Sequence, residues 1–116
     1  MNVIDIHTLR KRFVDKLLGV VTIITLDINN AHYDVGYLNA RVLNAHLIDA
    51  YEFKVITKEE YMAFLESEGA LETAFREGKY ENMVEAHDDF LGLVEDFGTD
   101  YVDTLRDKIS HIIKSV

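Results

Sequence analysis

The chain contains one long, nearly uncharged apolar run, Leu17-Leu18-Gly19-Val20-Val21-Thr22-Ile23-Ile24-Thr25-Leu26-Asp27-Ile28. Because the rest of the sequence is more polar, a folded state must bury this run and pack the other segments over it. The run is shorter than the roughly 20 apolar residues that a membrane-spanning helix needs, so we expect no membrane span. The conformation of this run therefore decides the fold class.

A β-hairpin is the first interpretation. Residues 20–25 are all β-branched, and such side chains favour strands because their χ1 torsions are restricted. Asn29-Asn30 suits a tight turn, and Tyr33 to Tyr37 alternates as a half-buried strand does. We therefore expect a helix that begins at Thr8 and ends at Gly19, followed by a hairpin from about Val20 to Leu38.

A single long helix is the competing interpretation. It would run from Thr8 to Ile28 and carry a narrow polar stripe of Asp15, Gly19, Thr22 and Thr25. Hydrophobic periodicity alone does not exclude this helix.

The remainder of the chain has mostly helical patterns. We expect a helix from about Asn39 to Tyr51 and a short third strand over residues 52–56. Thr57 and Glu60 form a capping-box sequence that begins another helix, and Gly69 and Gly78 bracket a further short one.

The clearest predicted helix spans Lys79 to Phe97. Its apolar residues recur at steps of three and four, at Tyr80, Met83, Val84, His87, Phe90, Leu91, Val94 and Phe97. Gly98 would end this helix and Thr99 would cap a last one. That last helix would bury Tyr101, Val102, Leu105, Ile109, Ile112, Ile113 and Val116.

These patterns predict a single domain over residues 1–116. The expected fold class is α+β and predominantly helical: an N-terminal helix, a β-hairpin and a helical C-terminal half, with an all-α bundle as the alternative. Cysteine is absent, which excludes disulfides and thiolate metal sites. The first residues lack a signal-peptide pattern, so the cytoplasm is the expected location.

Charge is unevenly distributed. The formal net charge is −9, and residues 57–103 hold 14 acidic against 3 basic residues, a net −11. Direct binding to nucleic acid is disfavoured, because such binding depends on Lys and Arg displacing counterions from phosphates. The exception is the predicted first helix, whose basic residues are Arg10, Lys11, Arg12 and Lys16.

A row of acids lies opposite the apolar stripe of the Lys79–Phe97 helix and continues into the last helix. Like charges three or four residues apart destabilise a helix by some tenths of a kcal/mol per pair, so stability alone would not select them. We therefore predict that this row binds a partner. Its residues are Glu81, Glu85, Asp88, Asp89, Glu95, Asp96, Asp100 and Asp103.

The size, charge and composition are similar to those of small acidic proteins of bacteriophages and mobile elements that imitate DNA, although no motif identifies one family. The predicted function is therefore a non-enzymatic inhibitor or regulator that binds a basic protein, with a nucleic-acid-binding protein as one such partner. The alternatives are a dimerising regulatory or assembly subunit that uses an apolar surface, and a small metal-dependent hydrolase.

The sequence gives only weak evidence for a catalytic or metal-binding site. Glu85 and His87 fall on different faces of the predicted helix, so we expect His87 to be a core residue with one hydrogen-bond partner. A cation site formed by Glu81, Glu85 and Asp88 is a minor alternative, as are His/Asp pairs drawn from His32, Asp34, His46 and Asp49. No metalloprotease, nucleophile-elbow or phosphate-binding motif is present. We therefore predict no cofactor, no metal and no catalytic residue.

Overall fold

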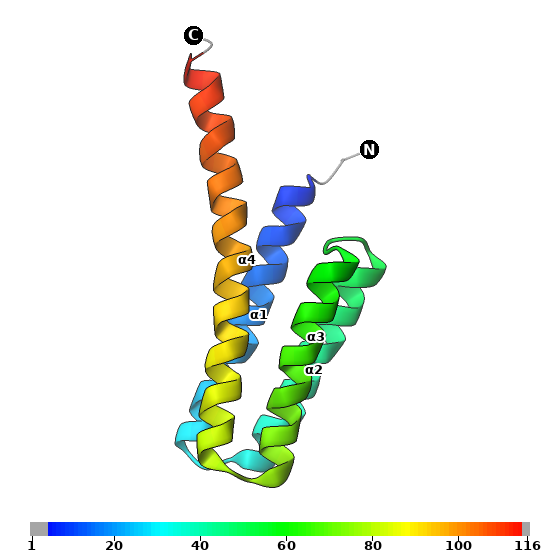
Figure 1. The fold of residues 1–116 in the computed structure, drawn as a ribbon, viewed down its shortest axis with the longest axis vertical. Helices are drawn as coiled ribbons and strands as arrows, with labels where there is room; N and C mark the ends of the chain where they lie inside the picture. Colours follow the sequence, from blue (N-terminus) through cyan, green and yellow to red (C-terminus); the bar gives the residue numbers. More distant parts are fainter. Residues whose placement is uncertain (1–4, 115–116) are drawn as a thin grey trace.

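The protein is an all-helical bundle. The computed structural model describes residues 5–114, with side chains described for residues 5–98. It has four helices, α1 (Ile6–Asn29), α2 (Tyr33–Glu52), α3 (Lys58–Glu77) and α4 (Tyr80–Lys114), and no strand within residues 5–114. Short connections make successive helices antiparallel, and the contacting pairs are α1–α2, α2–α3, α3–α4 and α1–α4 (Figure 1).

The predicted α+β fold with a hairpin from about Val20 to Leu38 is wrong. Helix α1 continues through residues 20–28, and the second predicted strand forms the first turns of α2. The Asn29-Asn30 pair does mark a turn, but this turn joins two helices. The alternative of a long helix and an all-α bundle is the one that the structure adopts.

Burial explains why the β-branched run is helical. Helix propensities of β-branched residues fall short of alanine by only about 0.5 kcal/mol each. In α1 the residues at helical spacing, Leu17, Val21, Ile24 and Ile28, are all buried, and each such burial stabilises by about 1.5–3 kcal/mol. The hydroxyls of Thr22 and Thr25 donate to the carbonyls of the residues four positions earlier, at 2.8 and 2.9 Å, so the helix leaves neither unsatisfied.

Several glycines expected to break helices do not. Gly19 lies inside α1, Gly69 inside α3 and Gly98 inside α4, so Thr99 caps no helix. A glycine costs a helix only about 1 kcal/mol relative to alanine, which packing can offset. The predicted strand at residues 52–56 is also wrong: Glu52 ends α2, and the other residues belong to the α2–α3 connection, in which Val55 and Ile56 are buried.

Other local predictions are confirmed. Thr57 caps α3 in a reciprocal capping box, with Thr57 N donating to Glu60 at 2.8 Å and Glu60 N donating to the Thr57 hydroxyl at 3.1 Å. Gly78 ends α3 in the left-handed conformation, at φ 70°. The N-cap of α1, however, is Asp5, which accepts from His7 N, and not Thr8.

The core is built from the inward faces of all four helices. Three phenylalanines, Phe13, Phe64 and Phe97, contact one another edge to face at centroid distances of 5.5–5.7 Å and join α1, α3 and α4. In α4 the predicted stripe is buried at Met83, Phe90, Val94 and Phe97, whereas Tyr80 is 54% exposed.

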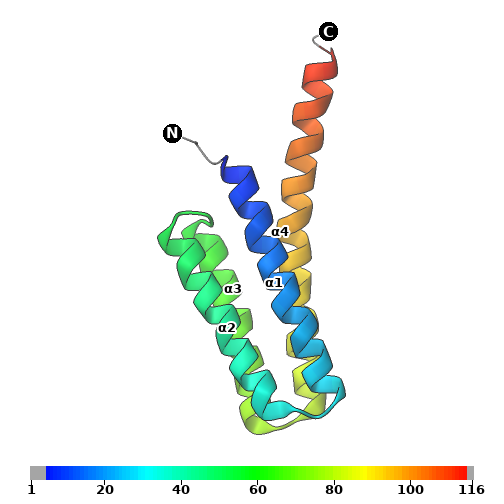
Figure 2. The same ribbon diagram turned by 180° about the vertical axis from the view of Figure 1, so that it is seen from behind.

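Helix α4 is longer than its neighbours. It projects past the end of the bundle at which α1 begins, in both views (Figures 1 and 2). The apolar side chains predicted for the last helix, from Tyr101 to Val116, lie outside the described side chains. Within the described residues, no helix is both long and apolar enough to cross a bilayer.

Candidate functional site

The outer face of α4 carries the predicted acidic row. Among its residues the described ones are all exposed: Glu81, Glu85, Asp88, Asp89, Glu95 and Asp96. Helix α4 turns its opposite side, centred on Phe90, into the core. The row therefore faces outward as predicted. Asp100 and Asp103 lie on the same continuous helix, and their side chains are outside those described.

The structure adds an acid from α3 to this surface. A shallow groove of about 320 Å³ separates α3 from α4, and Glu77, Glu85 and Asp89 line it together with Thr73 and Asn82. Glu77 precedes the left-handed turn at Gly78, which folds α4 back beside α3. Helical spacing along α4 could not identify Glu77, because its position depends on the pairing of two helices. We call the exposed acids of α4 and Glu77 the acidic face.

Most of this charge is not neutralised within the bundle. Asp88 Oδ1 lies 3.0 Å from His87 Nδ1. Within residues 5–98, Glu81, Glu85 and Asp89 form no salt bridge. Acidic side chains such as these three, which have no cationic partner among the described residues, can attract a basic surface.

One acid of the C-terminal half belongs to the interior. Glu68 on α3 is only 1% exposed. Burial, followed by a hydrogen bond and charge repulsion from Glu72, raises the pKa of Glu68 to about 8, while the Arg41 charge opposes this shift. Glu68 is therefore protonated at neutral pH and adds nothing to the acidic face.

His87 links α4 to α1. Its side chain is 11% exposed, its Nε2 lies 2.6 Å from Thr25 Oγ1, and its Nδ1 faces Asp88. The sequence predicted one partner, and the structure shows two. A hydroxyl, an imidazole and a carboxylate in series is the order found in acyl-transfer triads. Thr25, however, sits inside a helix whose backbone N–H groups are bonded within the helix, so they cannot serve as oxyanion donors. We assign this chain of contacts to helix packing.

The remaining His/Asp candidates are separated. His46 and Asp49 line one groove between α1 and α2, whereas His32 is the N-cap residue of α2 and Asp34 lies in its first turn. Within the described residues, no group of three or more His, Asp and Glu side chains is arranged to hold a metal ion.

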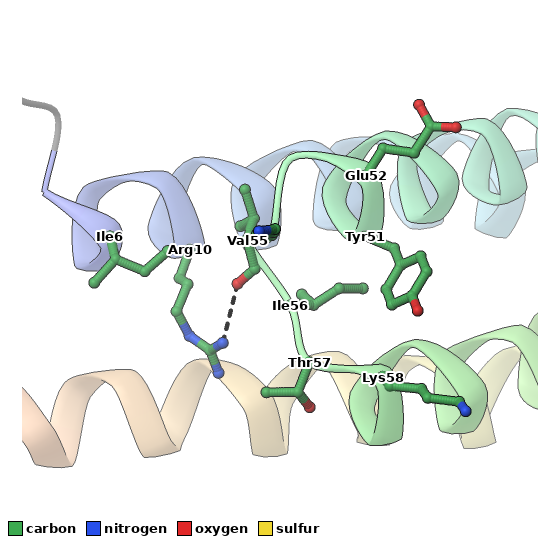
Figure 3. A pocket seen from close by; sticks show the side chains of 9 residues that line it. Ile6, Arg10, Tyr51, Glu52, Val55, Ile56, Thr57 and Lys58 are labelled. Carbon is green, nitrogen blue, oxygen red and sulfur yellow. Dashed lines mark hydrogen bonds between the residues drawn. The ribbon is translucent and has the colours of Figure 1, made fainter.

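The basic patch of α1 is smaller than the sequence implied, because Arg10 is part of the fold (Figure 3). Its guanidinium donates to both carboxylate oxygens of Glu60, at 3.0 and 2.6 Å, and to the Val55 carbonyl at 3.0 Å. It also lies 4.1 Å from the centroid of the Phe97 ring.

Arg10 thereby fixes the α2–α3 connection to α1, beside a pocket of about 660 Å³ that Ile6, Tyr51 and Ile56 help to line. Lys11, Arg12 and Lys16 remain exposed.

Comparisons of the chain with protein-family models, with curated proteins and with solved structures gave no match.

Proposed function

We propose that this protein is a non-enzymatic inhibitor or regulator that acts in the cytoplasm by binding a basic protein surface through its acidic face. The observation that supports this proposal is the exposure of all six described acids of the predicted row on the outer side of one continuous helix. A rigid element presents these charges at fixed spacing, so binding them orders no flexible segment.

The charge density suggests which basic surfaces would fit. The eight acids from Glu81 to Asp103 span about 33 Å of helix axis at 1.5 Å per residue, or about one charge per 4 Å. One strand of B-DNA carries one charge per about 3.4 Å. A groove that binds one nucleic-acid strand would therefore meet a similar density of negative charge on α4, which favours a nucleic-acid-binding protein as the partner.

Charge reversal tests this proposal. The wild-type protein is immobilised and exposed to lysate of the source cells, and captured proteins are identified by mass spectrometry after washes at low and at high salt. The variant Glu81→Lys/Glu85→Lys changes the net charge by +4, as does the control Asp15→Lys/Glu52→Lys, whose exposed sites lie on α1 and α2.

We expect a basic partner that binds the wild type and the control at about 0.1 M salt, leaves at about 1 M salt, and fails to bind the Glu81/Glu85 variant. The salt effect follows because the screening length falls from about 10 to about 3 Å. Equal capture by all three proteins would refute the proposal. Equal loss in both variants would show that net charge, and not the acidic face, controls binding.

A dimerising regulatory subunit is the second candidate, because α1 and α2 expose several large aliphatic side chains, among them Ile23, Leu26 and Val42.

A further inference from the structure

Helices α2 and α3 pack along a line of contact that we call the α2–α3 seam. At one end of the seam the Tyr51 ring stacks on the Tyr61 ring, with centroids 4.5 Å apart. Toward the other end Gly36 lies against the Phe75 ring, which leaves no room for a Cβ atom on Gly36. These two contacts fix which sides of α2 and α3 face each other and which residues lie at the same level.

Asn44 and Glu68 occupy the middle of this seam. On α3, Glu68 lies seven residues from both Tyr61 and Phe75, so the three side chains share one face of the helix. On α2, Asn44 lies about two turns from each of the residues that make the same two contacts. Asn44 and Glu68 are therefore at about the same level, midway between the two contacts.

The middle of the seam contains buried oxygen atoms without partners. Glu68 is only 1% exposed. Asn44 Oδ1 and Glu68 Oε1 have no hydrogen-bond partner in the described part of the chain, and Ser67 Oγ, next along α3, is a third such atom. A polar atom that is unpaired when buried and hydrated when exposed favours an open state by about five- to 150-fold. The polar centre therefore weakens the contact between α2 and α3.

The charged groups that act on Glu68 come from α3 itself and from α2. Burial, a hydrogen bond and repulsion from Glu72 raise the pKa of Glu68 to about 8, and the charge of Arg41 on α2 opposes this shift. The other helix that contacts α3 is α4. Its acids Glu85 and Asp89 line the α3–α4 groove, whose α3 residues lie about half a helical turn or less round the axis from one another and away from Glu68. The proton of Glu68 is therefore controlled at the α2–α3 seam.

The polar groups at two other helix contacts are paired. Between α1 and α2, Asn39 donates to the buried Asp27 at 2.7 Å. Between α1 and α4, Thr25 Oγ1 lies 2.6 Å from His87 Nε2. We therefore expect the α2–α3 seam to open more readily than the contact between α1 and α4.

We propose that the α2–α3 seam is a pH-sensitive joint, which opens with release of the Glu68 proton while α1 stays packed on α4. Separation of α2 from α3 brings the Glu68 carboxyl into water, where it ionises as an ordinary glutamate does. Between pH 4.5 and about 8 the closed seam holds a proton that the open seam has released. The open fraction therefore rises with pH in this range and levels off above it.

Thiol labelling can measure the opening of each contact, because the chain has no native cysteine. Ala40→Cys places a thiol on the seam side of α2, one turn from Gly36. Val21→Cys is its control at the α1–α4 contact, one turn from Thr25. Both positions are buried. The rate of labelling by dithiodipyridine, divided by the rate for the urea-unfolded chain at the same pH, gives the open fraction at each position.

We expect the open fraction at position 40 to rise about tenfold per pH unit from pH 5 to pH 8, because each opening releases one proton. At every pH it should exceed the open fraction at position 21 by about tenfold or more. Adding Glu68→Gln should remove the pH dependence at position 40, whereas adding the exposed control Glu66→Gln should leave it unchanged.

Equal open fractions at the two positions, both equal to the unfolded fraction from urea titration, would show that the seam opens only with global unfolding and would overturn the proposal. A flat pH profile at position 40, or a pH dependence that persists with Glu68→Gln, would overturn it as well. If Ala40→Cys does not fold, Leu47→Cys, buried seven residues further along α2, gives the same readout. These measurements need no partner of the acidic face, so the joint and the proposed function can fail separately.

Discussion

Glu68 should make the stability of this protein fall as the pH rises. Its carboxyl group is buried on α3, and its Oε1 has no hydrogen-bond partner within the described part of the chain. The pKa of Glu68 is raised from 4.5 to about 8 in the folded state. Between these two values the folded chain holds a proton that the unfolded chain has released.

Proton linkage gives the sign and the size of the effect. A raised pKa stabilises the folded state fully only below pH 4.5, and this contribution is lost as the pH rises toward 8. The loss amounts to about 1.4 kcal/mol per pH unit, or roughly 3 kcal/mol at pH 7 and roughly 5 kcal/mol at pH 8. Above pH 8 the charge itself is present in the interior beside Glu72, and the difference levels off.

The substitution Glu68→Gln removes this dependence. Glutamine is nearly isosteric, carries no titrating proton and can still donate to Glu72 through its amide. We therefore expect Glu68→Gln to gain stability relative to the wild type as the pH rises. The difference between their free energies of unfolding, variant minus wild type, should increase by about 1.4 kcal/mol per pH unit from pH 5 to pH 8. Urea unfolding followed by circular dichroism at unit pH intervals measures this difference.

Glu66→Gln is the matched control, because Glu66 is exposed on the same helix. Its unfolding free energy should run parallel to that of the wild type across the same pH range. If Glu68→Gln also ran parallel to the wild type, Glu68 would not hold a proton at neutral pH, and the assignment of a buried neutral carboxyl would be refuted.

Two further predictions concern stability. Arg10→Ala should lower the free energy of unfolding by about 2–4 kcal/mol, because it removes charge-assisted hydrogen bonds and a cation–π contact. Burial would raise the pKa of Glu60, but the bonds from Arg10 and the backbone hold it below its ordinary value. The difference in unfolding free energy between the wild type and Arg10→Ala should therefore narrow as the pH falls below 4.5, and the part due to Val55 and Phe97 should remain. Gly36→Ala places a methyl group against the Phe75 ring and should destabilise the protein by about 1–3 kcal/mol. Gly19→Ala places its methyl group in open space and should stabilise the protein by up to about 1 kcal/mol. Thermal unfolding measures both effects. Stabilisation by Gly36→Ala would show that the ring can move aside.

Sequence patterns identified the elements whose signals are local. The capping box at Thr57 and Glu60 involves four consecutive residues. Gly78 itself adopts the left-handed conformation that ends α3. The Lys79–Phe97 stripe is long enough for its period to be unambiguous, so the outward position of the acidic row followed from it. In each case the interaction that fixes the local structure lies within a few residues of the sequence pattern that predicted it.

The errors share a different physical origin. Gly19, Gly69 and Gly98 resemble helix ends, but their cost of about 1 kcal/mol is smaller than the burial of the residues around them. For residues 20–25, strand and helix both place apolar side chains inside, and only the partner surfaces of α2 and α4 decide between them. Glu68 likewise resembles any surface acid until α2 is packed against it. These outcomes depend on contacts between distant segments, which one sequence does not display.

The closure of the bundle by its first and last helices has a consequence for folding. Asp27 and Asn39 meet across a loop of 12 residues, whereas Thr25 and His87 are 62 residues apart. Loop-closure entropy makes the longer contact costlier by about 1.5 kcal/mol. We therefore expect the hairpins of neighbouring helices to form first and the docking of α4 on α1 to limit the folding rate. Substitutions at Thr25, which contacts His87 across this interface, should therefore slow folding.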